Sequence, residues 1–137
     1  MPTTATVKFQ GGSVVFVQAL ANASYTQVIT ITPPSGPAAV FQGSGEGNVP
    51  LPLTPGSFLT PGTKGGQASF MPPGGSSTLS TYKIAVTANG KPSQVEANSS
   101  SITTPSGSVL NLATALSEDS ADQDYNDGTV MFMQYTP

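Results

Sequence analysis

Apolar and polar residues alternate along most of the chain, and no stretch repeats apolar residues at the spacing of an amphipathic helix. The clearest alternating runs are TQVITIT at residues 26–32 and TYKIAVTA at residues 81–88. Because successive side chains of a strand point to opposite faces, such runs indicate strands with one buried face. Further strands are predicted at residues 7–9, 13–20, 38–42, 91–97, 101–104, 109–115 and 128–135.

Turn residues separate the predicted strands. Pro33 and Pro34 follow the run at residues 26–32 and end it, because proline cannot donate a hydrogen bond to a neighbouring strand. Asn89 and Gly90 follow the run at residues 81–88 and predict a tight hairpin, since both residue types tolerate a positive φ. About nine short strands joined by such turns predict an all-β fold: a single-domain antiparallel β-sandwich over residues 1–137.

The alternation is interrupted between residues 43 and 78, where Gly, Pro and Ser are frequent. Apolar residues there form only short islands, at residues 49–53, 57–59 and 68–71. A segment so poor in apolar residues cannot fold alone, so we expect a long excursion with one or two short strands rather than a second domain.

Composition removes several classes of function. The 137 residues include no cysteine and no histidine, which excludes disulfides, cysteine-based zinc sites and the commonest general base. Lysine and arginine together number four, too few for the basic surface of a nucleic-acid-binding protein. No apolar run predicts membrane insertion. The net charge of −3 favours a cation as partner.

Five of the seven acidic residues lie within ten positions, from Glu118 to Asp127. Two like charges about 4 Å apart repel by roughly 1 kcal/mol in water and ~4 kcal/mol at an effective dielectric constant of 20, so such crowding is costly without a cation. Carboxylate and amide oxygens select a hard cation, and Ca²⁺ accepts their irregular geometry more readily than Mg²⁺. A solvated acidic turn remains the simpler alternative.

Three segments together resemble a known family. The string SEDSADQDYND at residues 117–127 is similar to the calcium loop of the fucose- and mannose-binding lectins typified by Pseudomonas aeruginosa lectin II. ANASYTQ at residues 21–27 is similar to the A-N-x-x-x-T-Q segment of that family, and ANGKPS at residues 88–93 resembles its N-G-[RK]-P-S hairpin. The resemblance covers most of the chain outside approximately residues 46–78, which we interpret as an insertion in a calcium-dependent lectin domain.

The resemblance implies a centre with two Ca²⁺ ions per subunit. One further ligand is implied to come from the partner subunit of a homodimer or homotetramer, as the C-terminal carboxylate. Five carboxylates would then carry a charge of −5 against +4 from the two ions. The implied ligands are Asn22, Glu118, Asp122, Asp124, Asn126, Asp127 and the partner's Pro137.

The resemblance also implies how a sugar is bound. Vicinal hydroxyls of a mannose- or fucose-type monosaccharide would complete the coordination of both ions. Ala23, Ser24 and Tyr25 would form the specificity loop, and Asp119 would bind the sugar from the other side. Alanine at the first of these positions favours mannose in the family, whereas Tyr25 departs from the small residue common there.

The implied protein is a bacterial lectin and not an enzyme. No signal peptide is visible, so we expect synthesis in the cytoplasm, and release or attachment at the cell surface stays open. Glycoside hydrolysis would need a separate acid with a raised pKa, and Glu46 and Glu96 lie in unremarkable contexts. The other alternative is a calcium-stabilised β-sandwich of an adhesin or fibre, which would bind calcium but no sugar.

Overall fold

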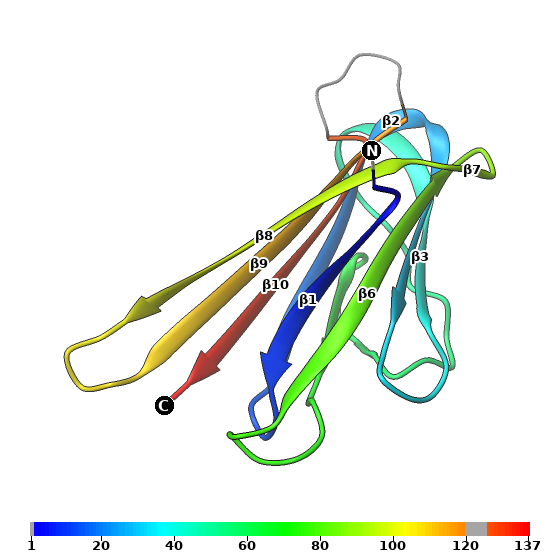
Figure 1. Cartoon of the computed structure of the whole chain (residues 1–137). Coiled ribbons are helices and arrows are strands. Elements are labelled where there is room, and N and C mark those ends of the chain that lie inside the picture. Colours follow the sequence, from blue (N-terminus) through cyan, green and yellow to red (C-terminus); the bar gives the residue numbers. More distant parts are fainter. Residues whose placement is uncertain (1, 120–125) are drawn as a thin grey trace.

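The chain folds into antiparallel β-strands joined by turns, as the alternating pattern predicts (Figure 1). The computed structural model describes residues 2–119 and 126–137. Every strand pair within those residues is antiparallel, which confirms the predicted all-β class. The strands are β1 (Thr4–Gln10), β2 (Val15–Thr32), β3 (Ala39–Pro50), β4 (Thr60–Pro61), β5 (Gln67–Phe70), β6 (Leu79–Ala88), β7 (Lys91–Pro92), β8 (Gln94–Thr103), β9 (Val109–Glu118) and β10 (Gly128–Thr136).

One long strand connects the two halves of the fold. The sequence pattern predicts separate strands at residues 13–20 and 26–32, but β2 continues through both. Its first half pairs with β5 and β10, and its second half pairs with β3 and β6. The intervening residues, ANASYT, contain no glycine or proline, so the chain bends through irregular pairing with β3 instead of ending in a turn.

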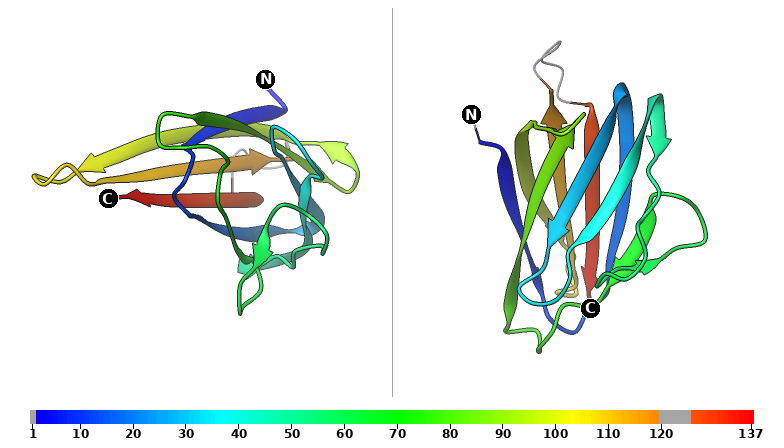
Figure 2. Two further views of the ribbon diagram at one scale, coloured as in Figure 1. Left: turned by 90° about the horizontal axis from the view of Figure 1, so that it is seen from below. Right: turned by 90° about the vertical axis from the view of Figure 1, so that its right-hand side faces the viewer.

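The strands follow the order β1-β6-β2-β10-β9-β8 (Figure 2). Off this path, β3 and β5 pair with β2, β4 pairs with β5, and β7 pairs with β6. The two outer strands of this path, β1 and β8, approach each other. The Val95 amide at the start of β8 donates to the carbonyl of Pro2, just before β1, at 3.0 Å. The sheet therefore curls around one apolar core. The end of β9 and the beginning of β10 lie at one end of the molecule, and the C-terminus lies at the other (Figure 1).

The core is filled differently at its two ends. An aromatic cluster occupies the half away from the beginning of β10, with Phe9 and Phe132 at a ring separation of 5.4 Å and Phe70 and Tyr82 at 4.9 Å. Toward the other end the buried residues of the first half of β2 shrink from valine to alanine, at Ala19 and Ala21. Small side chains there leave room for buried polar groups.

Residues 43–78 belong to the same core. They supply the second half of β3 together with β4 and β5, and β5 pairs directly with the beginning of β2. Leu51, Leu59 and Phe70 from this segment are buried. Within the described residues no helix is long and apolar enough to cross a membrane.

Candidate metal centre and the pocket beside it

The end of β9 and the beginning of β10 are tied together at the site. The Asp127 amide donates to the Ser117 carbonyl at 3.1 Å. The Ser117 hydroxyl accepts from the Gly128 amide and donates to the Gly128 carbonyl, both at 2.9 Å. A Cβ at position 128 would lie 3.0 Å from Ser117 Oγ and 3.3 Å from Val86 Cγ1, so a side chain there would require its neighbours to shift.

Three carboxylates converge at this junction. One oxygen from each of Glu118, Asp119 and Asp127 lies within 4.8 Å of the others. Glu118 and Asp127 are buried, and Asp119 is half-buried. The Asp119 amide donates to Asp127 Oδ2 at 2.9 Å, which holds the two residues together. Buried carboxylates are stable only when paired or bound to a metal, so this cluster could hold a cation.

The environment of Asp127 disfavours a free negative charge. Burial raises the pKa of Asp127 to about 6, the charges of Asp119 and Glu118 add to the increase, and the hydrogen bond from the Asp119 amide opposes it. A bound divalent cation reverses this balance, because it is the largest local charge and favours ionised carboxylates. The oxygen-only donor set matches a hard cation such as Ca²⁺.

Asn22 joins this region from the irregular middle of β2. Its amide donates to the Asp127 carbonyl at 2.9 Å, which places its backbone beside the cluster. Its side chain points to β3: Oδ1 accepts from the amides of Gly47 (3.1 Å) and Asn48 (2.6 Å), and Nδ2 donates to Asn48 Oδ1 at 2.8 Å. Both acceptor positions of Oδ1 are thus in use in the structure.

Two irregularities in the pairing of β2 with β3 shape the site. Between the pairs Ala21–Val49 and Ala23–Gly45, residues 46–48 of β3 lie opposite the single residue Asn22 of β2. Between the pair at Ala23 and the pair Gln27–Gly43, residues 24–26 of β2 lie opposite the single residue Ser44 of β3. Positive φ angles of 87° at Gly47 and 59° at Asn48 allow the first bulge, which wraps around the Asn22 side chain.

The second bulge carries the predicted specificity loop. Ala23 is buried and Ser24 is exposed, whereas Tyr25 is half-exposed. Tyr25 and Asp119 both line a cavity of about 440 Å³, together with residues 88, 89 and 91–93 at the hairpin that β6 enters. Two hydrogen bonds fasten the hairpin to β2: Thr26 N to Asn89 Oδ1 at 3.1 Å and Asn89 N to the Thr26 carbonyl at 3.0 Å.

The other predicted ligands are placed as follows. Asn126 is exposed beside Asp127. Asp122 and Asp124 lie outside the described residues. Pro137 lies at the far end of β10, whose nine residues separate it from the cluster by roughly 30 Å at about 3.3 Å per residue (Figure 1). Its carboxylate cannot reach the cluster of its own chain.

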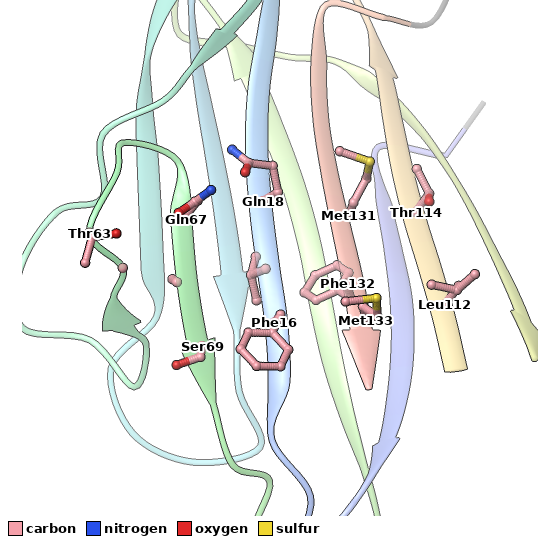
Figure 3. A pocket seen from close by; sticks show the side chains of 13 residues that line it. Phe16, Gln18, Thr63, Gln67, Ser69, Leu112, Thr114, Met131, Phe132 and Met133 are labelled. Atoms are coloured by element: carbon pink, nitrogen blue, oxygen red, sulfur yellow. The ribbon is translucent and has the colours of Figure 1, made fainter. Parts of the chain in front are cut away.

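A second cavity lies on the outer face of the sheet, away from the carboxylates. It measures about 720 Å³ and is lined by side chains from β2, β5, β9 and β10 (Figure 3). Phe16, Met131 and Met133 contribute exposed apolar surface to it. This outer apolar face offers no cluster of carboxylates, so it differs in chemistry from the candidate metal centre.

Several residues at the centre were not singled out from the sequence. The bulge at Gly47 and Asn48 lies in the segment interpreted as an insertion, and nothing in its sequence indicates its contact with Asn22. Gln27 and Ser93 are fully buried, and no described residue binds Gln27 Oε1 or the Ser93 hydroxyl. Both residues fall within the sequence motifs that resemble the lectin family. That resemblance was the signal that could have identified them.

Comparisons with known proteins agree on one family. A sequence model described as fucose-binding lectin II (PA-IIL) matches residues 7–136. A Ralstonia solanacearum high-affinity mannose-binding lectin has a similar structure, with a TM-score of 0.66, 29% identity and 93% of each chain covered. No curated protein matches at a significant level.

Two further solved structures are similar. The Chromobacterium violaceum lectin in complex with α-methyl-fucoside gives a TM-score of 0.64 with 27% identity, again over 93% of each chain. The C-terminal domain of a Burkholderia cenocepacia lectin gives 0.59 with 25% identity, over 95% of this chain and 96% of that chain.

Proposed function

Because the chain belongs to the fucose-binding lectin II family, we propose that it is a calcium-dependent lectin for a mannose- or fucose-type monosaccharide. The family that the three sequence motifs indicated is thereby confirmed. The observation that carries the proposal is the convergence of Glu118, Asp119 and Asp127 within 4.8 Å, next to the cavity of about 440 Å³ that Asp119 also lines. We propose a binding function without catalysis, in keeping with the lectin family to which the chain belongs.

The proposed centre holds two Ca²⁺ ions. Calcium takes six to eight oxygen ligands, and this end of the molecule is rich in carboxylate and amide oxygens. The ions would supply coordination positions for vicinal sugar hydroxyls, which would allow a shallow site to hold a neutral ligand. The proposed ligands are Asn22, Glu118, Asp122, Asp124, Asn126, Asp127 and the partner's Pro137.

The proposed role of Asn22 depends on the hydrogen bonds that it already makes. Its side-chain oxygen already accepts two hydrogen bonds from the bulge at residues 46–48. Its backbone is held against Asp127. We therefore propose that Asn22 serves the centre from this backbone position, with the carboxamide joining the ions only if a bond to the bulge is released.

The sugar is proposed to lie between the second bulge and Asp119. Tyr25 and Asp119 line the same cavity, which supports a role in sugar binding for both. Ser24 is exposed on the bulge, and Ala23 before it is buried. The similar structures include a mannose-binding lectin and a lectin in complex with α-methyl-fucoside. We propose mannose as the preferred sugar on the basis of Ala23.

Self-association would complete the centre. Pro137 is too far from its own cluster, so the proposed carboxylate must come from another copy. The outer apolar face lies on the strand that runs from the cluster to Pro137 (Figure 3). Two copies packed face to face with opposed strand directions would bring each C-terminus toward the partner's centre. We therefore propose a homodimer, or a homotetramer built from such dimers.

The decisive test is calorimetric titration of methyl mannoside and methyl fucoside into the untagged protein, first with calcium and then with excess chelator. We expect binding that disappears with chelator and weakens when the C-terminus is extended by a few residues. If calcium raises the melting temperature but neither sugar binds, the ions only brace the fold and the lectin function is wrong.

A further inference from the structure

The methionines of this protein lie on its surface rather than in its core. Within the described residues they are Met71, Met131 and Met133, and their exposed fractions are 59%, 38% and 44%. Methionine is usually among the buried residue types, yet the core cluster of the described residues contains none. Core packing therefore does not explain these side chains, and their chemistry at the surface becomes the question.

Met131 and Met133 occupy the middle of the outer apolar face. Exposed and buried residues alternate along this part of β10, so both methionines point to the same side of the sheet. Met133 pairs with Phe16 of β2 on one side and with Leu112 of β9 on the other. Both methionines line the cavity of about 720 Å³, where Figure 3 shows them on the face that also carries Phe16. A contact made through this face therefore includes both thioethers.

The thioether is the group on this face that an oxidant can change. The sequence contains no cysteine and no tryptophan, so a peroxide finds no thiol and the thioethers are its main targets. In that reaction the O–O bond of hydrogen peroxide breaks and one oxygen is bonded to the sulfur. The sulfur is oxidised by two electrons, and the peroxide is reduced to water. The product, methionine sulfoxide, is polar where the thioether was apolar.

We propose that Met131 and Met133 form an oxidation site that controls self-association, because their sulfoxides prevent this face from packing against a second copy. The inference rests on the proposed function, which uses the outer apolar face for the homodimer. A sulfoxide at position 133 would be buried beside Phe16 and Leu112, whose side chains offer no hydrogen-bond donor. Loss of the partner would also deprive each metal centre of the partner's Pro137.

Assembly and oxidation of this face oppose each other. In the separate chain both thioethers are exposed, whereas the proposed dimer covers them, so peroxide reaches them only in dissociated subunits. A higher protein concentration favours the dimer and should therefore slow their oxidation. In turn, oxidised subunits should associate more weakly, because a buried acceptor without a donor is costly.

The test treats the untagged full-length chain with hydrogen peroxide at several protein concentrations, with calcium held constant. Peptide mapping by mass spectrometry should show slower sulfoxide formation at Met131 and Met133 as the concentration rises. Met71 does not line the cavity and should be oxidised at a rate that does not depend on concentration. Analytical ultracentrifugation should show that the dimer dissociation constant of the treated protein rises roughly 10- to 100-fold.

Variants assign the loss to the two thioethers. Leucine keeps the apolar volume of methionine but cannot be oxidised. In the double variant Met131→Leu/Met133→Leu, peroxide should therefore leave the dimer dissociation constant at its value before treatment. Met133→Leu alone should protect more than Met131→Leu alone. The reason is that Gln18 and Thr114, which pair with Met131, can donate to a sulfoxide there. Met71→Leu is the matched control and should stay as sensitive as the wild type.

The outcomes separate this inference from the proposed function. If the untreated protein is monomeric at every concentration, the proposed self-association is wrong and the oxidation site fails with it. If the dimer persists with an unchanged dissociation constant after both methionines are oxidised, the oxidation site is wrong while the homodimer stands. Oxidation of Met131 and Met133 at a rate independent of concentration also overturns the inference. So does a double leucine variant that dissociates on treatment, because the damage must then lie elsewhere.

Discussion

The two ends of the sheet bury different kinds of side chain. The aromatic end is closed by large apolar side chains, and Phe9, Phe132 and Tyr82 are almost fully buried. The acidic end has alanines in its core and buries Glu118, Asp127 and the amide of Gln27. Apolar burial needs no polar partner, whereas buried carboxylates must be paired or bound to a metal. The comparison teaches that the aromatic end is stabilised by its own side chains, and we propose that a bound cation further stabilises the acidic end.

The largest effect is expected at the aromatic end. Phe132→Ala removes a buried ring that packs 5.4 Å from Phe9, and should lower the free energy of unfolding by about 3–5 kcal/mol. The loss should be the same with calcium and with chelator. Urea denaturation under both conditions measures it, and Leu79→Ala on the exposed surface should change stability by about 0.5 kcal/mol at most. A loss that depends on calcium would contradict the separation of the two ends.

At the acidic end, removing one carboxylate should abolish the response to calcium. In wild-type protein, calcium at 100 times its dissociation constant should stabilise the fold by ~2.7 kcal/mol. Asp127→Asn should lose this stabilisation and sugar binding together. In chelator the variant should be as stable as the wild type or more so, because it lacks a charge that Glu118 and Asp119 repel. Thermal unfolding with and without calcium tests both parts.

A smaller effect is expected where β9 meets β10. Gly128→Ala places a methyl group 3.0 Å from Ser117 Oγ and should cost about 1–3 kcal/mol by overpacking. It should also weaken calcium binding, since Asp127 is the preceding residue. Gly75→Ala is the control, because a Cβ there meets nothing within 4 Å. Equal melting temperatures for the two variants would show that the junction tolerates a side chain.

The smallest effect concerns the bulge that holds Asn22. Asn48→Gly keeps the backbone angle of 59° accessible but removes the bond from Asn22 Nδ2, and should cost ~1 kcal/mol. Asn48→Ala loses the same bond and adds backbone strain, so it should be less stable than the glycine variant. Chemical denaturation in chelator ranks the two. The reverse order would mean that the side-chain bond contributes little.

Much of the fold could be predicted from alternation. The run at residues 81–88 lies wholly within β6 (Leu79–Ala88), because its alternating side chains match a strand with one buried face. Asn89 adopts a positive φ of 48° in the predicted hairpin. The continuation of β2 through residues 21–26 could not be predicted, since it depends on bulges made with β3, which lies more than a dozen residues further along the chain.

The candidate site was predictable only in part, for a similar reason. Glu118, Asp119 and Asp127 are crowded within a short segment, so the repulsion between their charges is enough to indicate a cation. Asn22 contacts Asn48, and Tyr25 and Asp119 line one cavity, although the residues of each pair are far apart in sequence. No local sequence pattern indicates such contacts.

The sequence by itself determined the strand class, the acidic segment and the family, because alternation, charge density and short motifs are properties of neighbouring residues. Only the tertiary structure decided which side chains share the centre. Bulges in β2 and β3 turn Asn22 and Tyr25 in different directions, and the length of β10 separates Pro137 from its own cluster. These outcomes depend on how strands pair across the chain, which no single segment specifies.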